Sequence, residues 1–261
     1  MRLNPGRALA GLCLAGMLLG VWAVPANAQT AAANEKPRLY TYAAYWTIPR
    51  ARWEDMAKAG TANQKIFDAA VSDGTIVGYG NQESLVHQVE GPTHTNWWAA
   101  TSIAGLFNVL DQIYKSKSVA APVFASATKH WDSIYVSRFY EWHPGSLKGA
   151  YVHGASYKLK ADAPDNAVET LSKSFAVPLF QKLMANGTVS AYQIAEEAIH
   201  TEDPAMFYIF YITPKAEGLD KVNAALREAL GANGLAAPAF GSMVDFAAHR
   251  DSVSQGDSTL K

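Results

Sequence analysis

The stretch Lys65–Tyr79 reads KIFDAAVSDGTIVGY, and the stretch Pro178–Tyr192 reads PLFQKLMANGTVSAY. The two align without a gap at a constant offset of 113 residues, with Phe, Gly-Thr and Tyr at matching positions. The same offset places His87 on His200. An ordered series of matches over most of the chain indicates an internal duplication, and a duplication sets the architecture before any motif does.

Outward from these stretches, both halves show the same order of expected elements. Strands are predicted at 38–46, 75–81, 95–101 and 132–142, and again at 151–160, 188–194, 206–213 and 243–250. Helices are predicted at 53–71 and 103–117, and again at 168–184 and 217–230. Pro178 predicts a break in one helix and Gly60-Thr61 a break in another. Gly74 and Gly187 follow helices and predict left-handed C-caps.

The predicted fold class is α+β, because the order β-α-β-β-α-β is that of a ferredoxin-like unit. We expect two tandem ferredoxin-like repeats that form a pseudo-dimeric α+β barrel. The expected boundaries are a signal peptide at 1–28, a flexible leader at 29–37, a first repeat at 38–148, a second repeat at 149–253 and a tail at 254–261.

Tandem units of this length with aromatic-rich strands make the chain resemble the dimeric α+β barrel superfamily. The resemblance covers nearly all of residues 38–261 but depends on element order and repetition, without a motif that assigns a functional branch. It implies two sheets that face each other. Members of the superfamily include cofactor-free monooxygenases, isomerases, haem enzymes of the chlorite dismutase type and proteins without known activity, so the resemblance selects no reaction.

The N-terminus has the layout of a secretory signal peptide. Arg2 and Arg7 precede an apolar run over 8–24, and Ala26-Asn27-Ala28 gives a small-x-small cleavage pattern. A membrane anchor is the alternative, although the run is short for a span. We therefore expect export to the periplasm or the extracellular space. The only cysteine, Cys13, would leave with the signal, so the mature chain could form no disulfide.

Composition narrows the class of partner. The formal net charge is −1 and charged residues make up 17%, which argues against a nucleic-acid binder because such proteins normally carry a basic excess. After signal removal, no further apolar run reaches the length of a membrane span. We expect a soluble monomer or homodimer.

The weak catalytic candidates are histidines and the carboxylates near them. His87 and His200 recur at the repeat offset, and Glu202 follows the second of them. His249 and Asp245 lie in the last predicted strand. A carboxylate can fix the tautomer of an imidazole and raise its basicity, which suits a general base. The alternative for His87 and His200 is that the loops that contain them are turns retained from the ancestral repeat.

The candidate ligand-binding residues lie on predicted strands. Tyr45, His153 and Tyr157 would line a barrel cavity if their faces point inward, and an ordinary aromatic core is the alternative. Arg138 and Arg250 recur late in the final strands. Each would be a cation that needs a partner, which is either a ligand carboxylate or a structural ion pair.

These residues support three functions at this stage. The first is binding of a small apolar or aromatic ligand between the repeats, and the second is a cofactor-independent oxygenase or isomerase with a His/carboxylate group. The third is a non-catalytic structural or interaction protein. No pair of histidines has metal-ligand spacing, and the predicted helices contain no histidine that would hold haem. We expect neither a metal nor a cofactor.

Overall fold

The computed structural model describes residues 36–201, 205–232 and 236–261. The predicted signal peptide, nearly all of the predicted leader and Glu202 lie outside these residues. Residues 37–261 form one compact unit. No helix in the described part of the chain has both the length and the apolar character needed to cross a membrane.

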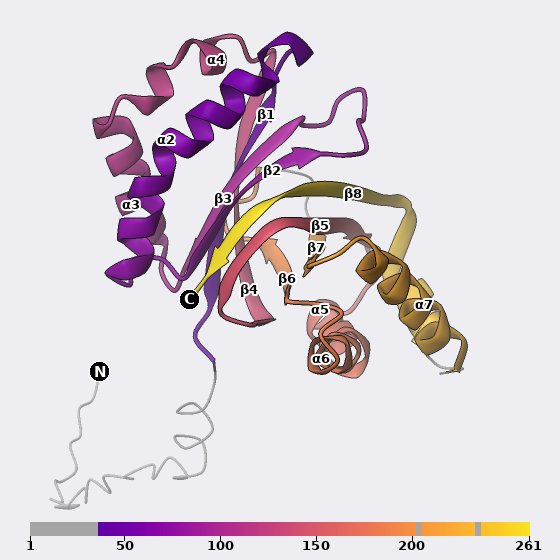
Figure 1. The fold of residues 1–261 in the computed structure, drawn as a ribbon. Coiled ribbons are helices and arrows are strands. Elements are labelled where there is room, and N and C mark those ends of the chain that lie inside the picture. Colours follow the sequence, from indigo (N-terminus) through magenta and orange to yellow (C-terminus); the bar gives the residue numbers. More distant parts are fainter. Residues whose placement is uncertain (1–35, 202–204, 233–235) are drawn as a thin grey trace, which may run out of the picture. The chain divides into compact units, whose positions relative to one another are not determined.

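The chain forms eight strands with helices between them (Figure 1). The strands are β1 (Leu39–Thr47), β2 (Gly78–Ser84), β3 (His94–Ala100), β4 (Lys129–Trp142), β5 (Gly145–Leu159), β6 (Ala191–Glu197), β7 (Met206–Thr213) and β8 (Val244–Leu260). The α-helices are α2 (Trp53–Ser72), α3 (Ile103–Lys115), α4 (Pro122–Ala125), α5 (Ala167–Leu171), α6 (Val177–Ala185), α7 (Glu217–Ala232) and α8 (Ala236–Met243). Short 3-10 turns occupy Arg50–Arg52 and Ser118–Ala120, and a π-helix occupies Ser172–Ala176.

All eight strands form a single closed antiparallel barrel in the order β1-β3-β2-β8-β5-β7-β6-β4. The predicted arrangement of two tandem ferredoxin-like repeats is therefore wrong. The strands do not form two sheets, because β8 pairs with both β5 and β2, and β4 pairs with both β1 and β6. Closure satisfies the backbone groups that a separate sheet would expose at its edges.

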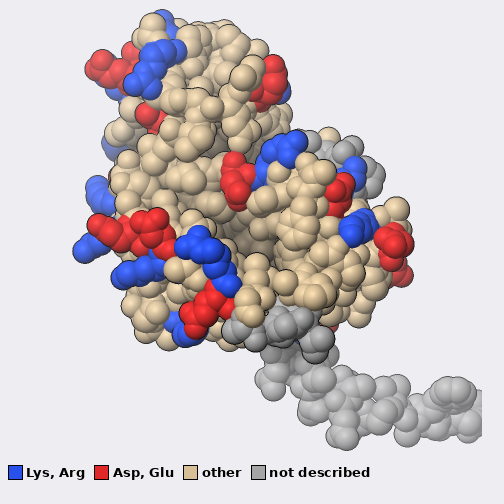
Figure 2. Space-filling view, turned by 90° about the vertical axis from the view of Figure 1, so that its right-hand side faces the viewer, with Lys and Arg blue, Asp and Glu red and all other residues tan. Residues whose placement is uncertain are grey.

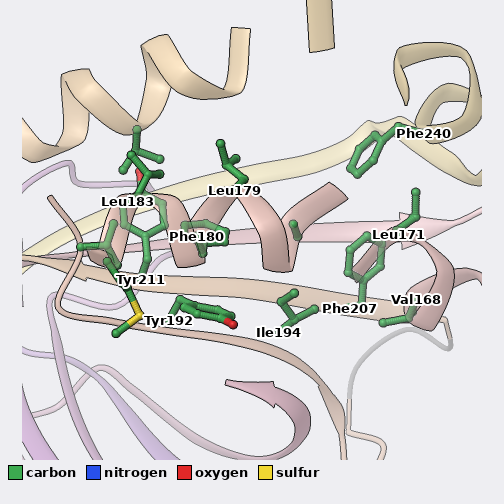
Figure 3. Close-up of a cluster of buried hydrophobic side chains, with 14 of the residues drawn as sticks. Val168, Leu171, Leu179, Phe180, Leu183, Tyr192, Ile194, Phe207, Tyr211 and Phe240 are labelled. Carbon is green, nitrogen blue, oxygen red and sulfur yellow. The ribbon is translucent and has the colours of Figure 1, made fainter. Parts of the chain in front are cut away.

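Helices of the two halves cover different sides of the barrel (Figure 1). On one side, α2 and α3 bury Phe67 and Leu106 against the outer faces of β1 and β3. On the other side, α6 buries Phe180 and Leu183 against β6 and β7 (Figure 3). Each core includes stacked rings, such as Phe180 on Tyr192 at 5.1 Å between ring centroids. The helices thus fix the outer faces of the strands and leave the inner faces to the barrel lumen.

Local sequence explains how the helices begin and end. The Ser102 hydroxyl accepts a hydrogen bond from the Gly105 N–H at 3.1 Å and caps α3. Gly74 and Gly187 have φ of 82° and 74°, as their positions after helices predict. Pro178 lies at the start of α6, directly after the π-helix, so the predicted break is confirmed. The break predicted at Gly60-Thr61 is wrong, because α2 is continuous there.

Candidate functional site

A cavity of about 140 Å³ lies inside the barrel. All eight strands contribute to its wall, because alternate residues of each strand point inward. The aromatic part of the wall consists of Tyr45, Trp97, Tyr135, Trp142 and Phe210 together with the edges of two further tyrosines. For comparison, a cavity of about 150 Å³ with an apolar lining holds one benzene molecule. The lumen therefore has room for a molecule of about one ring.

A few polar side chains interrupt the apolar wall. Thr41 Oγ1 donates to Gln193 Oε1 at 3.2 Å, and the hydroxyls of Tyr45 and Tyr135 are 2.8 Å apart. Glu141 also lines the cavity and is exposed, which places a carboxylate at its rim. A mainly apolar pocket with a few fixed polar groups is the usual design of a small-molecule site.

Gln82 is the polar group of the wall that the fold leaves unsatisfied. It is 7% exposed, and Ser254 Oγ donates to its Oε1 at 3.3 Å. Its Nε2 is buried and has no hydrogen-bond partner among the described residues. A buried polar group without a partner costs about 1–3 kcal/mol. If the amide is flipped, the oxygen is unpartnered instead, so one hydrogen-bonding position remains in either orientation.

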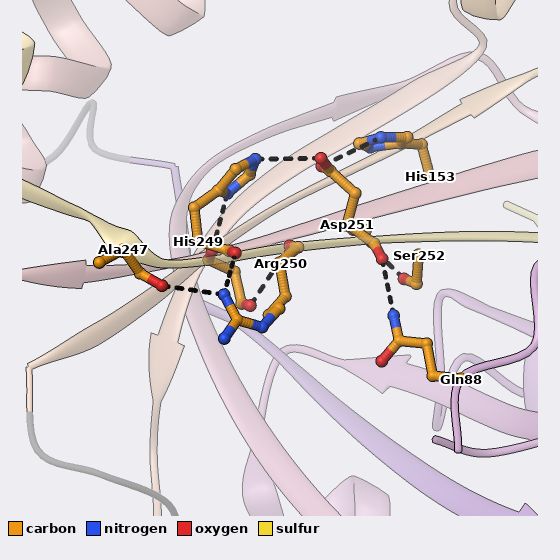
Figure 4. A network of polar contacts seen from close by, with 9 residues as sticks. Gln88, His153, Ala247, His249, Arg250, Asp251 and Ser252 are labelled. Carbon is orange, nitrogen blue, oxygen red and sulfur yellow. Dashed lines mark hydrogen bonds and ion pairs between the residues drawn. The ribbon is translucent and has the colours of Figure 1, made fainter. Parts of the chain in front are cut away.

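A second group of titratable residues lies on β5 and β8. Asp251 Oδ1 is 3.3 Å from His153 Nε2, and Asp251 Oδ2 is 3.0 Å from His249 Nε2 (Figure 4). His249 Nδ1 donates to the carbonyl of Ser156 at 3.0 Å, which fixes a proton on that atom. One carboxylate thus orients two imidazoles.

The surroundings of this histidine pair are aromatic. His153 stacks on Tyr211 and His249 stacks on Tyr157, with ring centroids 4.7 and 4.3 Å apart. Burial lowers the pKa of His153, and the nearby Asp251 carboxylate opposes that shift. Burial also raises the pKa of Tyr157 to about 12. At neutral pH His153 and Tyr157 are therefore uncharged.

The predicted ligand residues divide between the two faces of the barrel. Tyr45 lines the cavity, whereas His153, Tyr157 and His249 lie on the outer face and do not line it. Tyr45 and Tyr157 align at an offset of 112, one residue short of the main offset. A slip of one residue moves a strand side chain to the opposite face, which explains the separation.

Both predicted arginines are exposed and outside the cavity. Arg138 Nη1 is 3.6 Å from Glu169 Oε2, and Arg138 Nη2 is 3.9 Å from Glu196 Oε2. An irregularity between Ser137 and Phe139 shifts the register of β4 and breaks the alternation that predicts an inward Arg138. Arg250 donates to the carbonyls of Ala247 and His249, so its nearest polar contacts are backbone atoms.

The remaining catalytic candidates are apart from one another. His87 is exposed in the loop between β2 and β3, where its ring lies 5.3 Å from that of Trp53. His200 is exposed after β6. Asp245 accepts a hydrogen bond from the Ala247 N–H at 3.0 Å, and the carboxylate beside His153 and His249 is that of Asp251 instead. The described residues contain no group of three or more potential ligands suited to a metal ion.

Several cavity residues escape sequence reasoning, among them Gln82, Trp97 and Phe210. The sequence signal that could have identified Gln82 is the alternation along β2, where Gly78, Gly80 and Gln82 lie on the same face of the strand. A side chain at Gly80 would meet the Trp97 ring at 2.5 Å, so this small residue makes room for an inward tryptophan.

Charged side chains are scattered over the face in Figure 2, with both signs interspersed. The view shows no extended basic patch of the kind that a nucleic-acid backbone requires. This agrees with the near-zero net charge of the chain.

No protein-family model matches the chain, and no curated protein matches it in sequence. Solved structures do resemble it. A proposed monooxygenase from Lactobacillus acidophilus NCFM is 11% identical with a TM-score of 0.59, over 86% of this chain and 97% of that one. A proposed monooxygenase from Fusobacterium nucleatum is 8% identical with a TM-score of 0.53, over 86% and 93%.

A proposed chlorite dismutase is also similar, at 9% identity and a TM-score of 0.51, over 85% of this chain and 95% of that one. At such low identity the likeness is one of fold and transfers no residue role. The similarities therefore concern the fold alone and assign no functional branch.

Proposed function

We propose that the protein binds a small, mainly apolar molecule with one aromatic ring and one hydrogen-bonding group inside its barrel. The observation that carries the proposal is Gln82, whose amide is buried in the cavity wall with one unpartnered atom. A ligand acceptor placed against Nε2 removes the cost of that burial. The cavity volume of about 140 Å³ limits the ligand to roughly one ring.

Calorimetric titration of the purified protein with phenol and with toluene tests this proposal. The two probes have nearly the same shape, but only phenol can bond to the Gln82 amide. We expect saturable binding with a preference for phenol, and loss of the preference in Gln82→Met. Gln112→Met, an exposed change on α3, is the matched control. Two results would contradict the proposal: neither probe binds, or Gln82→Met prefers phenol as strongly as the wild-type protein does.

A cofactor-independent oxygenase or isomerase is the second candidate, and Glu141 is the observation that favours it. Such an enzyme needs an acid–base group against the ligand. Among the described residues, those that line the cavity include no histidine, whereas Glu141 brings a carboxylate to the rim of the cavity. The fold likeness to proposed monooxygenases supports the same candidate. Oxygen consumption with phenolic substrates tests the oxygenase: we expect oxygen uptake that Glu141→Gln abolishes, and no uptake would remove the oxygenase.

Export also belongs to the proposal, since its signal lies outside the described residues. Expression of the full chain in a bacterial host, followed by intact-mass measurement, tests it. We expect a mature form that begins at Gln29. An uncleaved chain retained in the cytoplasm would contradict export.

A further inference from the structure

We propose that the groove between α2 and the outer face of β2, β3 and β8 is a second binding site, for a neutral, hydroxyl-rich molecule of monosaccharide size. The groove adjoins the barrel cavity at Gln82, which lines both, but the proposal uses other residues and does not depend on the function proposed for the cavity. The groove measures about 310 Å³. Pockets for drug-sized ligands measure about 300–1,000 Å³.

Polar side chains from both walls line this groove beside the apolar Met56, Ala57 and Leu147, although a helix on a sheet normally buries an apolar stripe. The helix contributes Thr61 and Gln64, and the strands contribute Asn81, Asn96 and Gln255. Further along the same helix, Phe67 packs in the apolar core in the ordinary way. The polar lining residues of α2 are thus confined to its first half, where the apolar contacts of the helix are those of Met56 and Ala59 in a separate buried cluster.

Gly60 lines the groove and presents no side chain to it. A glycine inside a helix costs about 1 kcal/mol relative to alanine. Other glycines of this protein are required by close contacts: a Cβ at Gly105 would lie 2.8 Å from the carbonyl of Thr75. A Cβ at Gly60 would meet only the side chain of Asn81, at 3.8 Å, which is an ordinary contact. Packing therefore does not require this glycine, and a side chain larger than alanine would project into the groove.

His94 presents an acceptor to the groove. Burial, and secondarily His87, lowers its pKa to about 4, so the ring is neutral at physiological pH. The Thr93 hydroxyl lies 3.1 Å from the carbonyl of Trp46 and 3.0 Å from His94 Nδ1, and donation to the carbonyl favours the tautomer in which His94 Nδ1 carries the proton. The lone pair of His94 then lies on Nε2.

The space beside this lone pair suits a hydroxyl donor. His94 Nε2 is 3.9 Å from Glu83 Oε2, which is too long for a hydrogen bond. Both atoms accept, so a donor between them would satisfy either one. Asn96 Nδ2 donates to Asn81 Oδ1 at 2.7 Å, which orders the two amides. Asn81 Nδ2 then remains as a donor and Asn96 Oδ1 as an acceptor for a ligand. Alternating donors and acceptors match a polyol.

Charge excludes the common anionic ligands. The charged residues of the groove are Glu83, Asp257 and one lysine, Lys148, whose Nζ lies 4.0 Å from Asp257 Oδ2. These sum to a negative site, with the only cation drawn toward a carboxylate. A phosphate or carboxylate ligand needs an excess of donors and positive charge. The groove therefore fits a neutral molecule.

Titration of the ¹⁵N-labelled full chain with D-glucose and with myo-inositol tests the proposal. We expect saturable shifts of the side-chain amide signals of Asn81 and Asn96. Gly60→Leu should weaken binding by about tenfold or more because it fills the groove, whereas the matched control Gly60→Ala should stay within about twofold. Asn96→Leu keeps the volume, removes the polar partner and should weaken binding similarly. It decides the matter if Gly60→Leu does not fold.

Three results would overturn the proposal. The first is the absence of saturation with both neutral probes. The second is unchanged affinity in Gly60→Leu or, where that variant does not fold, in Asn96→Leu. The third is tighter binding of glucose 6-phosphate or glucosamine than of glucose, which would show a charged ligand class. Phenol binding in the barrel is scored by the phenol preference and its loss in Gln82→Met, and sugar binding by Gly60→Leu and Asn96→Leu, so failure at one site does not decide the other.

Discussion

The carboxylate of Asp251 lies 3.0 Å from Nε2 of His249 and is shared with the neighbouring imidazole of His153. Asp251 favours the protonated form of His153, while burial disfavours it. We therefore expect Asp251→Asn to lower the pKa of His153 further below its ordinary value of 6.5. An NMR pH titration of the His153 ring protons measures this change.

Asp245→Asn is the matched control for Asp251→Asn, because Asp245 is on the same strand and bonds the Ala247 N–H instead. We expect this control to leave the His153 titration unchanged. A His153 pKa that rises in Asp251→Asn, or moves equally in both variants, would show that the shared carboxylate does not set its charge.

His94 predicts a loss of stability in acid. Its pKa falls from 6.5 to about 4 on folding, so the unfolded chain binds the proton more readily. Stability that is present above pH 6.5 is thus lost as the pH falls toward 4, by up to about 3 kcal/mol. Urea denaturation between pH 4 and 7.5 measures the slope.

His94→Gln should flatten that slope, whereas His143→Gln, an exposed control, should retain it. The slope should not vanish entirely, because burial also lowers the pKa of His153. A wild-type protein whose stability is constant across this range would refute the assignment of a neutral, buried His94.

Sequence reasoning succeeded where a local signal decides a local structure. Gly74 and Gly187 both adopt positive φ because the helix ends there need it. Pro178 disturbs its helix because it lacks an N–H. Tyr45 was expected in the cavity as the repeat counterpart of Tyr157, and it lies in the cavity wall although Tyr157 does not.

The features that were not predicted depend on strand pairing and register, which no local stretch of the sequence encodes. Residues 254–260 are rich in Ser, Gly and Asp and were predicted as a tail, yet they pair with β2 and close the barrel. The shift near Arg138 and the one-residue slip at Tyr157 reverse the faces of side chains. Gln82 was missed because a buried amide has no sequence signature.

Two helical glycines should respond oppositely to alanine. Gly60→Ala should stabilise the protein by about 0.5–1 kcal/mol, because helix propensity improves and the Cβ meets only an ordinary contact. Gly105→Ala should destabilise it by about 1–3 kcal/mol, because its Cβ would crowd the carbonyl of Thr75 and the side chain of Ala100. Urea denaturation of both variants checks the pair; equal effects would contradict the packing described for α2.

Closure of the barrel depends on a close approach at Gly256, which is in register with Gln82. A Cβ there would overlap the carbonyl oxygen of Asn81 and lie 2.8 Å from Cα of Gln82, so β2 and β8 would have to separate. We expect Gly256→Ala to cost about 2–3 kcal/mol and to reduce hydrogen-exchange protection along β2. Gly241→Ala, whose Cβ would meet only Phe246 at 3.9 Å, is the control and should be neutral or slightly stabilising. If Gly256→Ala leaves the urea midpoint and the protection of β2 unchanged, pairing of β2 with β8 does not hold the barrel closed.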